Sequence, residues 1–166
     1  HASAILADLE AYGFTSTVGV YDPTGSVSDC VSELNEGLGT ISYTGHGSTQ
    51  CFGNGCQVCI SDINGLTNTH MFPWIISVAC VNGQFDAGTC FAEAWMRATH
   101  NGLPSGASAI YASSVNQSWA PPMSAQDEIY DLFCSETYVT LGALCYAGSC
   151  LMMDEYGSAG VEMYET

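Results

Sequence analysis

The chain has 166 residues, of which 47% are apolar, so it is long enough to bury the core of one domain. Acidic residues total 17, whereas Arg97 is the only lysine or arginine, and the net charge is −16. So few cations argue against nucleic acid and against anionic lipid as partners, because both bind through lysine and arginine. No apolar run reaches the roughly 18 residues of a membrane-spanning helix, so we predict no membrane insertion.

Cysteine usage indicates the compartment. Nine cysteines in a chain of this size are typical of an oxidising environment, so we predict a secreted or cell-surface protein. The odd number leaves at least one thiol outside intrachain disulfides. Two sets of local partners are considered: Cys145 with Cys150, and members of the group Cys51, Cys56 and Cys59.

Helical and strand-like segments alternate along the chain. Ile5, Leu6 and Leu9 have helical spacing, and Ser26 can cap a second helix that Gly37 ends. The predicted elements, in chain order, are a helix over residues 2–12, a strand over 15–21, a turn at 22–25, a helix after 26, a strand over 40–44, a cysteine-rich loop over 49–59, a strand over 74–79, a helix over 91–99, a strand over 107–112, and helix from 122 onward.

This alternation predicts an α/β fold with an open, mostly parallel sheet and helices on both faces. The strand over residues 74–79 is a nearly continuous apolar run, as expected for a strand that is buried on both faces. No repeat or linker divides the chain, so we predict one domain over residues 1–166.

Two polar loops directly follow predicted strands. His46, between two glycines, follows the strand over residues 40–44, and Cys80 follows the strand over 74–79. Binding sites in such sheets gather outside the carboxyl ends of the strands, and a nucleophilic cysteine needs a nearby imidazole. The spacing therefore predicts that His46 and Cys80 meet, although a turn histidine and a buried structural thiol fit the same pattern.

Several segments resemble the gingipains, the caspase-like cysteine peptidases. They are Tyr-Thr-Gly-His-Gly-Ser (43–48), Ser-Val-Ala-Cys-Val-Asn-Gly (77–83), Cys-Phe-Ala-Glu-Ala-Trp-Met-Arg-Ala (90–98) and Ile-Tyr-Ala-Ser-Ser-Val-Asn-Gln-Ser-Trp-Ala-Pro-Pro-Met (110–123). The resemblance runs in the same order over nearly the whole chain. It is closer to the arginine-cleaving branch than to the lysine-cleaving branch.

The resemblance implies a caspase-like fold and a catalytic mechanism. Cys80 would attack the scissile carbonyl, His46 would transfer the protons, and the backbone N–H groups of Gly47 and Cys80 would form the oxyanion hole. Substrate-binding residues implied by the same match are Asn116, Gln117, Trp119 and Met123. From its own neighbours, Trp119 beside two prolines fits a surface-loop anchor equally well.

The resemblance also implies further parts of the catalytic unit. The acidic residue of the arginine pocket, the acidic residue that orients the histidine, and a preceding subdomain would lie upstream of His1, and a further strand would follow Thr166. We therefore expect either a processed fragment with companion chains from the same precursor or a shortened relative. No cofactor is expected. Two metal sites stay as alternatives: a structural calcium ion on Asp127, Glu128 and Asp131, and a zinc site at Cys56, Cys59 and His70.

The leading hypothesis is a secreted cysteine endopeptidase that cleaves polypeptides after a basic residue, with arginine favoured. It would explain the scarcity of lysine and arginine as resistance to self-cleavage, for which compositional drift is the alternative. The rival hypothesis is a catalytically reduced gingipain-like domain that acts as an extracellular structural or self-assembling subunit. A charged-residue content of only 11% fits such packing against neighbours.

Overall fold

A computed structural model describes residues 1–86 and 88–165. The helices in this part of the chain are α1 (Ala2–Tyr12), α2 (Val27–Glu36), α3 (Ile60–Ile63), α4 (Phe91–Arg97), α5 (Ala120–Cys134), α6 (Leu141–Tyr156) and α7 (Ser158–Tyr164). The strands are β1 (Thr40–Thr44), β2 (Trp74–Val78), β3 (Thr99–His100), β4 (Leu103–Pro104) and β5 (Ala109–Ala112). Two compact units result: a helical unit, which joins His1–Gly19 to the segment beginning at Gln117, and a sheet unit, Val20–Asn116.

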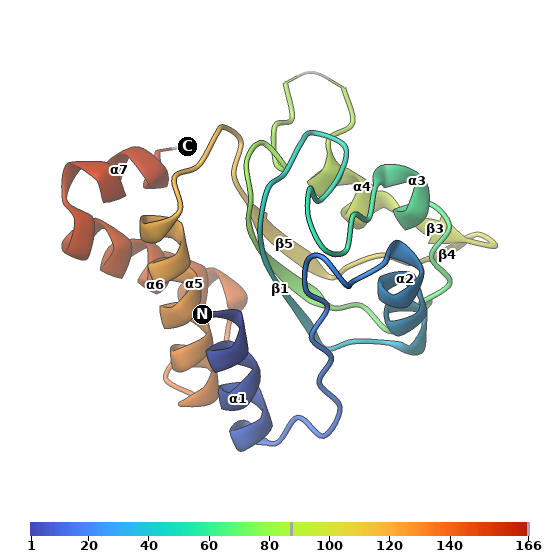
Figure 1. The fold of residues 1–166 in the computed structure, drawn as a ribbon, viewed down its shortest axis with the longest axis horizontal. Coiled ribbons are helices and arrows are strands. Elements are labelled where there is room, and N and C mark those ends of the chain that lie inside the picture. Colours follow the sequence, from blue (N-terminus) through green and yellow to red (C-terminus); the bar gives the residue numbers. More distant parts are fainter. Residues whose placement is uncertain (87, 166) are drawn as a thin grey trace. The chain divides into compact units, whose positions relative to one another are not determined.

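The sheet unit is built on three parallel strands in the order β1-β2-β5 (Figure 1). The register pairs Thr44 of β1 with Val78 of β2, and Ser77 of β2 with Ala112 of β5. The central strand is buried from Ile75 to Val78, as its apolar run predicts. Because the strands are parallel, their carboxyl ends lie at one edge of the sheet. The predicted α/β class with a mostly parallel sheet is confirmed.

The core of the sheet unit lies between the sheet and the helices α3 and α4. Its large side chains with no exposed area include Ile63, Leu66, Ile75, Phe91 and Trp95, and each contributes about 1.5–3 kcal/mol by burial. The rings of Phe91 and Trp95 meet edge to face with their centroids 6.1 Å apart. This packing fixes the start of α4 close to the loop that follows β2.

Helix α2 shows why this sequence begins a helix where it does. The Ser26 hydroxyl accepts a hydrogen bond from the backbone N–H of Asp29 at 3.2 Å, as the predicted cap requires. The Asp29 carboxylate in the first turn is favoured by the helix dipole. Cys30 and Leu34, one turn apart, form the buried face of α2.

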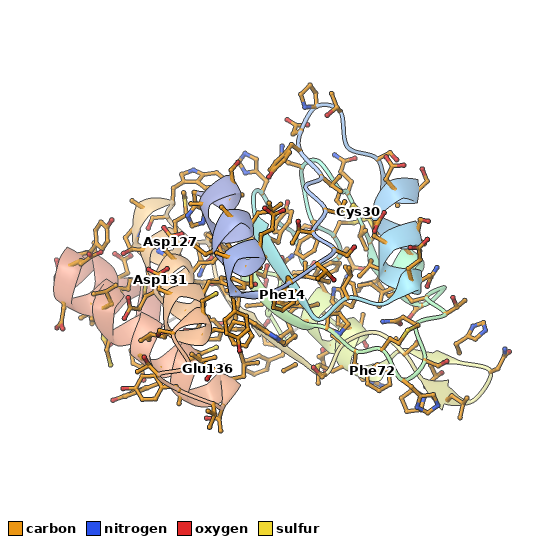
Figure 2. The ribbon with its side chains drawn as sticks, turned by 90° about the horizontal axis from the view of Figure 1, so that it is seen from below. Phe14, Cys30, Phe72, Asp127, Asp131 and Glu136 are labelled. Carbon is orange, nitrogen blue, oxygen red and sulfur yellow. A yellow bond between two sulfur atoms is a disulfide. The ribbon has the colours of Figure 1, made fainter. Side chains whose placement is uncertain are left out.

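The helical unit packs α5 against α6 and α1. Gly148 of α6 allows the close approach to α5, because a Cβ atom there would lie 2.6 Å from the carbonyl oxygen of Ala125. Figure 2 labels Asp127 on α5, whose carboxylate lies 2.9 Å from the His1 imidazole, and Phe14, whose ring packs edge-on against Phe133. None of the described helices is long and apolar enough to cross a bilayer.

Three sequence predictions about these elements are wrong. Residues 15–21 form no strand: they are mostly exposed and contain the boundary between the two units, and β-branched composition makes no strand without a pairing neighbour. The helix predicted over 91–99 ends at Arg97, because Thr99 and His100 pair with β4. Cys145 and Cys150 form no disulfide. Five residues apart on α6, they point to different sides of that helix.

Candidate active site

The loops that follow β1 and β2 meet at the edge where both strands end. The backbone N–H of Gly45 donates to the carbonyl oxygen of Val78 at 3.1 Å and so extends the ladder between the strands by one residue. A Cβ atom at Gly47 would lie 2.7 Å from the carbonyl oxygen of Cys80 and 2.8 Å from the Cβ atom of Ala79. The structure therefore brings the His46 loop into contact with the backbone of the Cys80 loop.

Cys80 is partly buried and lies outside both disulfides of the described chain. The next residue, Val81, has a φ of 51°, which costs a β-branched side chain about 1–3 kcal/mol. Two hydrogen bonds hold this turn against the segment after β5: Val81 N–H donates to Val115 O at 3.0 Å, and Gly83 N–H donates to Ser113 O at 2.8 Å. Residues held in such conformations cluster at functional sites, so the conformation of Val81 supports a functional role for the neighbouring Cys80.

The backbone of His46 is held on both sides. Its N–H donates to the Asn54 side-chain oxygen at 3.0 Å, and its carbonyl oxygen accepts from the Gly53 N–H and from the Tyr43 hydroxyl, both at 2.7 Å. The Tyr43 ring is stacked on Phe52 with the centroids 3.7 Å apart. Burial raises the pKa of Tyr43, so its hydroxyl keeps the proton that it donates to His46.

Gly47 pairs with Phe52 in an isolated antiparallel bridge. The two hydrogen bonds of this bridge run from Gly53 N to His46 O and from Ser48 N to Cys51 O, so the bridge does not use the N–H of Gly47 itself. The absence of a side chain lets the backbone come this close to Cys80. Both features suit an N–H donor of an oxyanion hole, the role predicted for Gly47.

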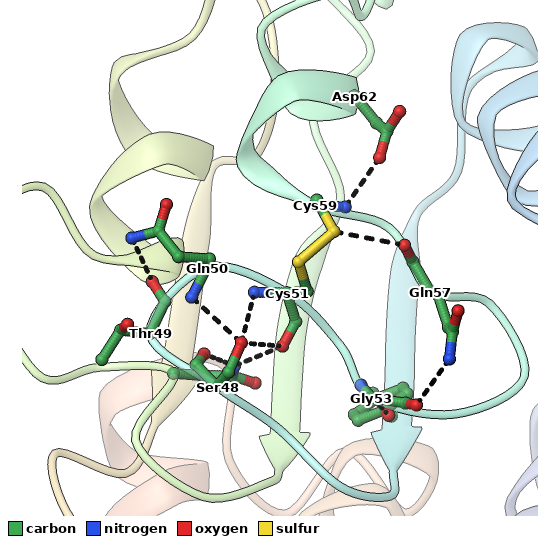
Figure 3. The surroundings of a disulfide bond; sticks show 10 residues. Ser48, Thr49, Gln50, Cys51, Gly53, Gln57, Cys59 and Asp62 are labelled. Atoms are coloured by element: carbon green, nitrogen blue, oxygen red, sulfur yellow. Dashed lines mark hydrogen bonds between the residues drawn. A yellow bond between two sulfur atoms is a disulfide. The ribbon is translucent and has the colours of Figure 1, made fainter.

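Gly53 and Asn54, two of the three residues that hold His46, belong to a loop closed by disulfides, which we call the braced loop (residues 51–59). Cys51 is bonded to Cys59 (Figure 3). Cys56 is bonded to Cys30 of α2. The Cys59 N–H donates to the Asp62 carboxylate at 2.8 Å, which caps α3 at the far end of the loop. The expected pairing within the cysteine-rich loop is confirmed for Cys51 and Cys59, whereas sequence reasoning gave no sign of the partner of Cys56.

The zinc alternative is wrong, because the sulfur atoms of Cys56 and Cys59 are both consumed by disulfides. In the described ranges no group of three or more histidine, cysteine or acidic side chains is arranged to hold a metal ion. Asp127 and Asp131 lie one turn apart on α5 (Figure 2), and the His1 imidazole is paired with Asp127. A structural calcium ion stays a prediction without an assigned site.

Removing the Cys51–Cys59 disulfide of the braced loop is expected to lower the stability of the fold and to loosen the hydrogen bonds that hold His46. A disulfide that spans eight residues contributes about 2–3 kcal/mol, so Cys51→Ser with Cys59→Ser should lower the free energy of unfolding by about that amount. Urea unfolding measures the change. Asn54→Ala is the matched control, since it removes one hydrogen bond to His46 and leaves both disulfides, at a cost of about 1 kcal/mol. An unchanged urea midpoint in the double variant would show that the disulfide adds no stability.

The predicted substrate-binding residues divide between the two units. Asn116 is exposed at the end of the sheet unit, whereas Gln117, Trp119 and Met123 belong to the helical unit. Trp119 precedes α5 with 51% of its surface exposed, and Met123 is partly buried on that helix. Their roles, like those of His46, Gly47 and Cys80, stay predictions.

Sequence reasoning assigned no role to three residues that support the two loops: Tyr43, Asn54 and Asn82. The Asn82 side chain donates to the carbonyl oxygen of Ser48 at 2.7 Å and so joins the Cys80 turn to the His46 loop. A polar residue in the turn after a buried strand, as in Cys-Val-Asn-Gly (80–83), marks Asn82 as a candidate, although its partner Ser48 is not visible in the sequence.

The parallel sheet with its two touching strand-end loops defines a caspase-like α/β fold, and the chain belongs to peptidase family C25, whose family model matches residues 4–165. It is 37% identical over 171 residues to gingipain R2 of Porphyromonas gingivalis, covering 100% of this chain and 23% of that relative. It is 34% identical over 110 residues to Lys-gingipain HG66 of the same species, covering 65% of this chain and 6% of that relative. The gingipain resemblance is confirmed.

A solved structure leads to the same family. The crystal structure of the Arg-specific cysteine proteinase gingipain R matches with a TM-score of 0.95 at 37% identity. The match covers 99% of this chain and 39% of that one. The chain thus spans well under half the length of these relatives.

Proposed function

We propose that this chain carries the nucleophile and the proton-transfer residue of a cysteine endopeptidase that cleaves after a basic residue, with arginine favoured. The observation that carries the proposal is the contact between Gly47, next to His46, and the backbone of Cys80. Membership of peptidase family C25 supports the reaction class. The similarity to gingipain R, an Arg-specific cysteine proteinase, supports the preference for arginine.

In the proposed reaction, His46 takes the proton of the Cys80 thiol, and the thiolate attacks the scissile carbonyl carbon to form a C–S bond. The carbonyl oxygen becomes negative and accepts hydrogen bonds from the N–H groups of Gly47 and Cys80, each worth about 3–4 kcal/mol in comparable enzymes. The imidazolium then protonates the leaving amine as the C–N bond breaks. Water, deprotonated by His46, attacks the thioester, releases the acid and restores the thiol.

The placement of Arg97 fits a basic-residue specificity. Arg97 is the only lysine or arginine, so Arg97–Ala98 is the only bond of this chain that such an enzyme would attack. That bond ends α4, the Ala98 side chain is buried, and the Ala98 carbonyl oxygen accepts from the Ser105 N–H at 3.0 Å. A bond held in this way cannot extend across an active site without local unfolding, so the native chain would resist its own activity.

The proposed setting is extracellular, either secreted or at the cell surface. Two disulfides in the sheet unit support an oxidising compartment. The proposed partners are a polypeptide substrate and companion chains from the same precursor, in keeping with relatives several times longer than this chain.

The test uses the intact protein with any companion chains. A peptidyl-arginyl chloromethyl ketone is compared with its lysyl and norleucyl analogues, and the alkylated residue is mapped by mass spectrometry. We expect the arginyl probe to label Cys80 fastest and to stop hydrolysis of arginyl reporter peptides. Absence of both turnover and labelling at Cys80, together with a large ordered assembly, would instead support the structural-subunit hypothesis.

A further inference from the structure

A fully buried amide lies between the two loops of the candidate site. The Asn82 side chain has no exposed surface, and its nitrogen donates to the carbonyl oxygens of Ser48 at 2.7 Å and Cys51 at 3.2 Å. Its oxygen accepts from the Ser77 hydroxyl at 2.9 Å. Both amide hydrogens and one face of the oxygen are therefore used within the protein.

The position of Asn82 is itself fixed. Ser77 lies on the central strand β2, and the carbonyl oxygen of Asn82 accepts from the Ala92 N–H in the first turn of α4 at 2.9 Å. Asn82 is thus hydrogen-bonded to the sheet and to a helix that is packed in the core. Its amide contacts the His46 loop from this fixed position. Buried hydrogen bonds of this kind specify one arrangement, because a displaced partner stays unsatisfied at a cost of about 1–3 kcal/mol per group.

The Asn82 amide lies between the two loops that would carry out the proposed chemistry. Asn82 follows Cys80 by two residues, and its two acceptors, Ser48 and Cys51, lie on either side of the turn after His46. A Cβ atom at Gly47 would lie 3.0 Å from the Asn82 nitrogen, so Gly47 is packed directly on the amide. A change in the hydrogen bonds from Asn82 to Ser48 and Cys51 would therefore move the Gly47 N–H relative to the Cys80 sulfur.

We propose that Asn82 is a positioning residue that sets the spacing between the His46–Gly47 loop and the Cys80 turn. The inference rests on the proposed function, because the spacing matters only if these loops act on one substrate. Asn82 touches neither substrate nor reacting atoms. It acts on the turnover step, since displacing an oxyanion donor by about 1 Å costs on the order of 100-fold in rate.

The experiment uses a matched pair of buried asparagines in the full protein. Asn68 also has no exposed surface, and its amide makes three hydrogen bonds, to Met71 O at 3.0 Å, to Gly106 O at 2.8 Å and from Gly106 N at 2.8 Å. Asn82→Ala and Asn68→Ala therefore delete similar buried networks. We expect similar losses of thermal stability, but a fall in kcat of ~10- to 100-fold only for Asn82→Ala, with KM changed less than about threefold.

Two further readouts separate positioning from general damage. Alkylation of Cys80 by iodoacetamide needs no oxyanion hole, so its rate should stay within about threefold of wild type in Asn82→Ala. Asn82→Asp keeps the shape, but its ionised carboxylate faces two carbonyl oxygens, whereas the protonated acid can donate to one of them. Its kcat relative to wild type should therefore rise as the pH falls through the pKa of that acid, even if the alanine variant fails to fold.

Equal kcat in wild type and Asn82→Ala, or an equal fall in Asn68→Ala, would overturn the positioning role. So would an Asn82→Asp variant whose relative kcat does not depend on pH. Failure of the proposed function looks different, because wild type itself would then show neither turnover nor labelling of Cys80.

Discussion

Replacing Cys80 with alanine is expected to lower kcat for arginyl peptides by at least ~1,000-fold. Without the sulfur atom no C–S bond forms, and only substrate binding and the oxyanion donors are left to accelerate hydrolysis. His46→Ala should cause a loss of the same order, since the thiol would lose its proton acceptor and the leaving amine its proton donor. Because the two residues act as a unit, the double variant should be little slower than either single variant.

The matched control for Cys80→Ala is Cys134→Ala. Cys134, on α5 of the helical unit, is also partly buried and outside both disulfides, and burial raises the pKa of its thiol, which keeps it protonated at neutral pH. Its replacement should leave kcat unchanged in a steady-state assay on arginyl reporter peptides. Equal losses in both variants would indicate general damage, and full activity of Cys80→Ala would remove the nucleophile assignment.

Local pattern was enough to predict the elements that carry the two loops. The apolar run of β2 identifies a buried strand and the β-branched start of β1 a partly buried one, and polar residues directly after both strands mark the edge of the sheet. The prediction of a strand over residues 15–21 was wrong because local pattern does not show which segments will pair. Its composition is equally favourable, but no neighbouring strand pairs with it, and pairing is a property of the whole fold.

The support of the candidate site could not be predicted, because it depends on contacts between residues far apart in the sequence. Asn82 bonds to Ser48, 34 residues earlier, and Cys56 is joined to Cys30 across 26 residues. In each case the residue type is visible in the sequence but the partner is fixed by the path of a loop. Cys80 and His46, by contrast, follow directly after strands, whose ends sequence patterns identify well.

Gly47→Ala is expected to have the second large effect. The added Cβ atom would lie 2.7 Å from the Cys80 carbonyl oxygen and 2.8 Å from the Ala79 Cβ atom, closer than real Cβ atoms approach such neighbours. Because the nearest atom belongs to the backbone, no side chain can swing aside, and the His46 loop must move away from the Cys80 turn. Such a shift would also displace the Gly47 N–H, so kcat should fall by ~100- to 1,000-fold.

A second glycine offers the matched control, because a Cβ atom at Gly142 of α6 would meet no atom within 4 Å. Gly142→Ala should leave kcat unchanged and raise the free energy of unfolding by up to ~1 kcal/mol, since alanine favours a helix over glycine. Steady-state kinetics and urea unfolding measure both variants. If Gly47→Ala kept wild-type kcat, the close approach of the two loops would not be needed for turnover. If it lost activity while Cys80 was still alkylated at the wild-type rate, the defect would lie in stabilising the oxyanion, because alkylation requires the thiolate alone.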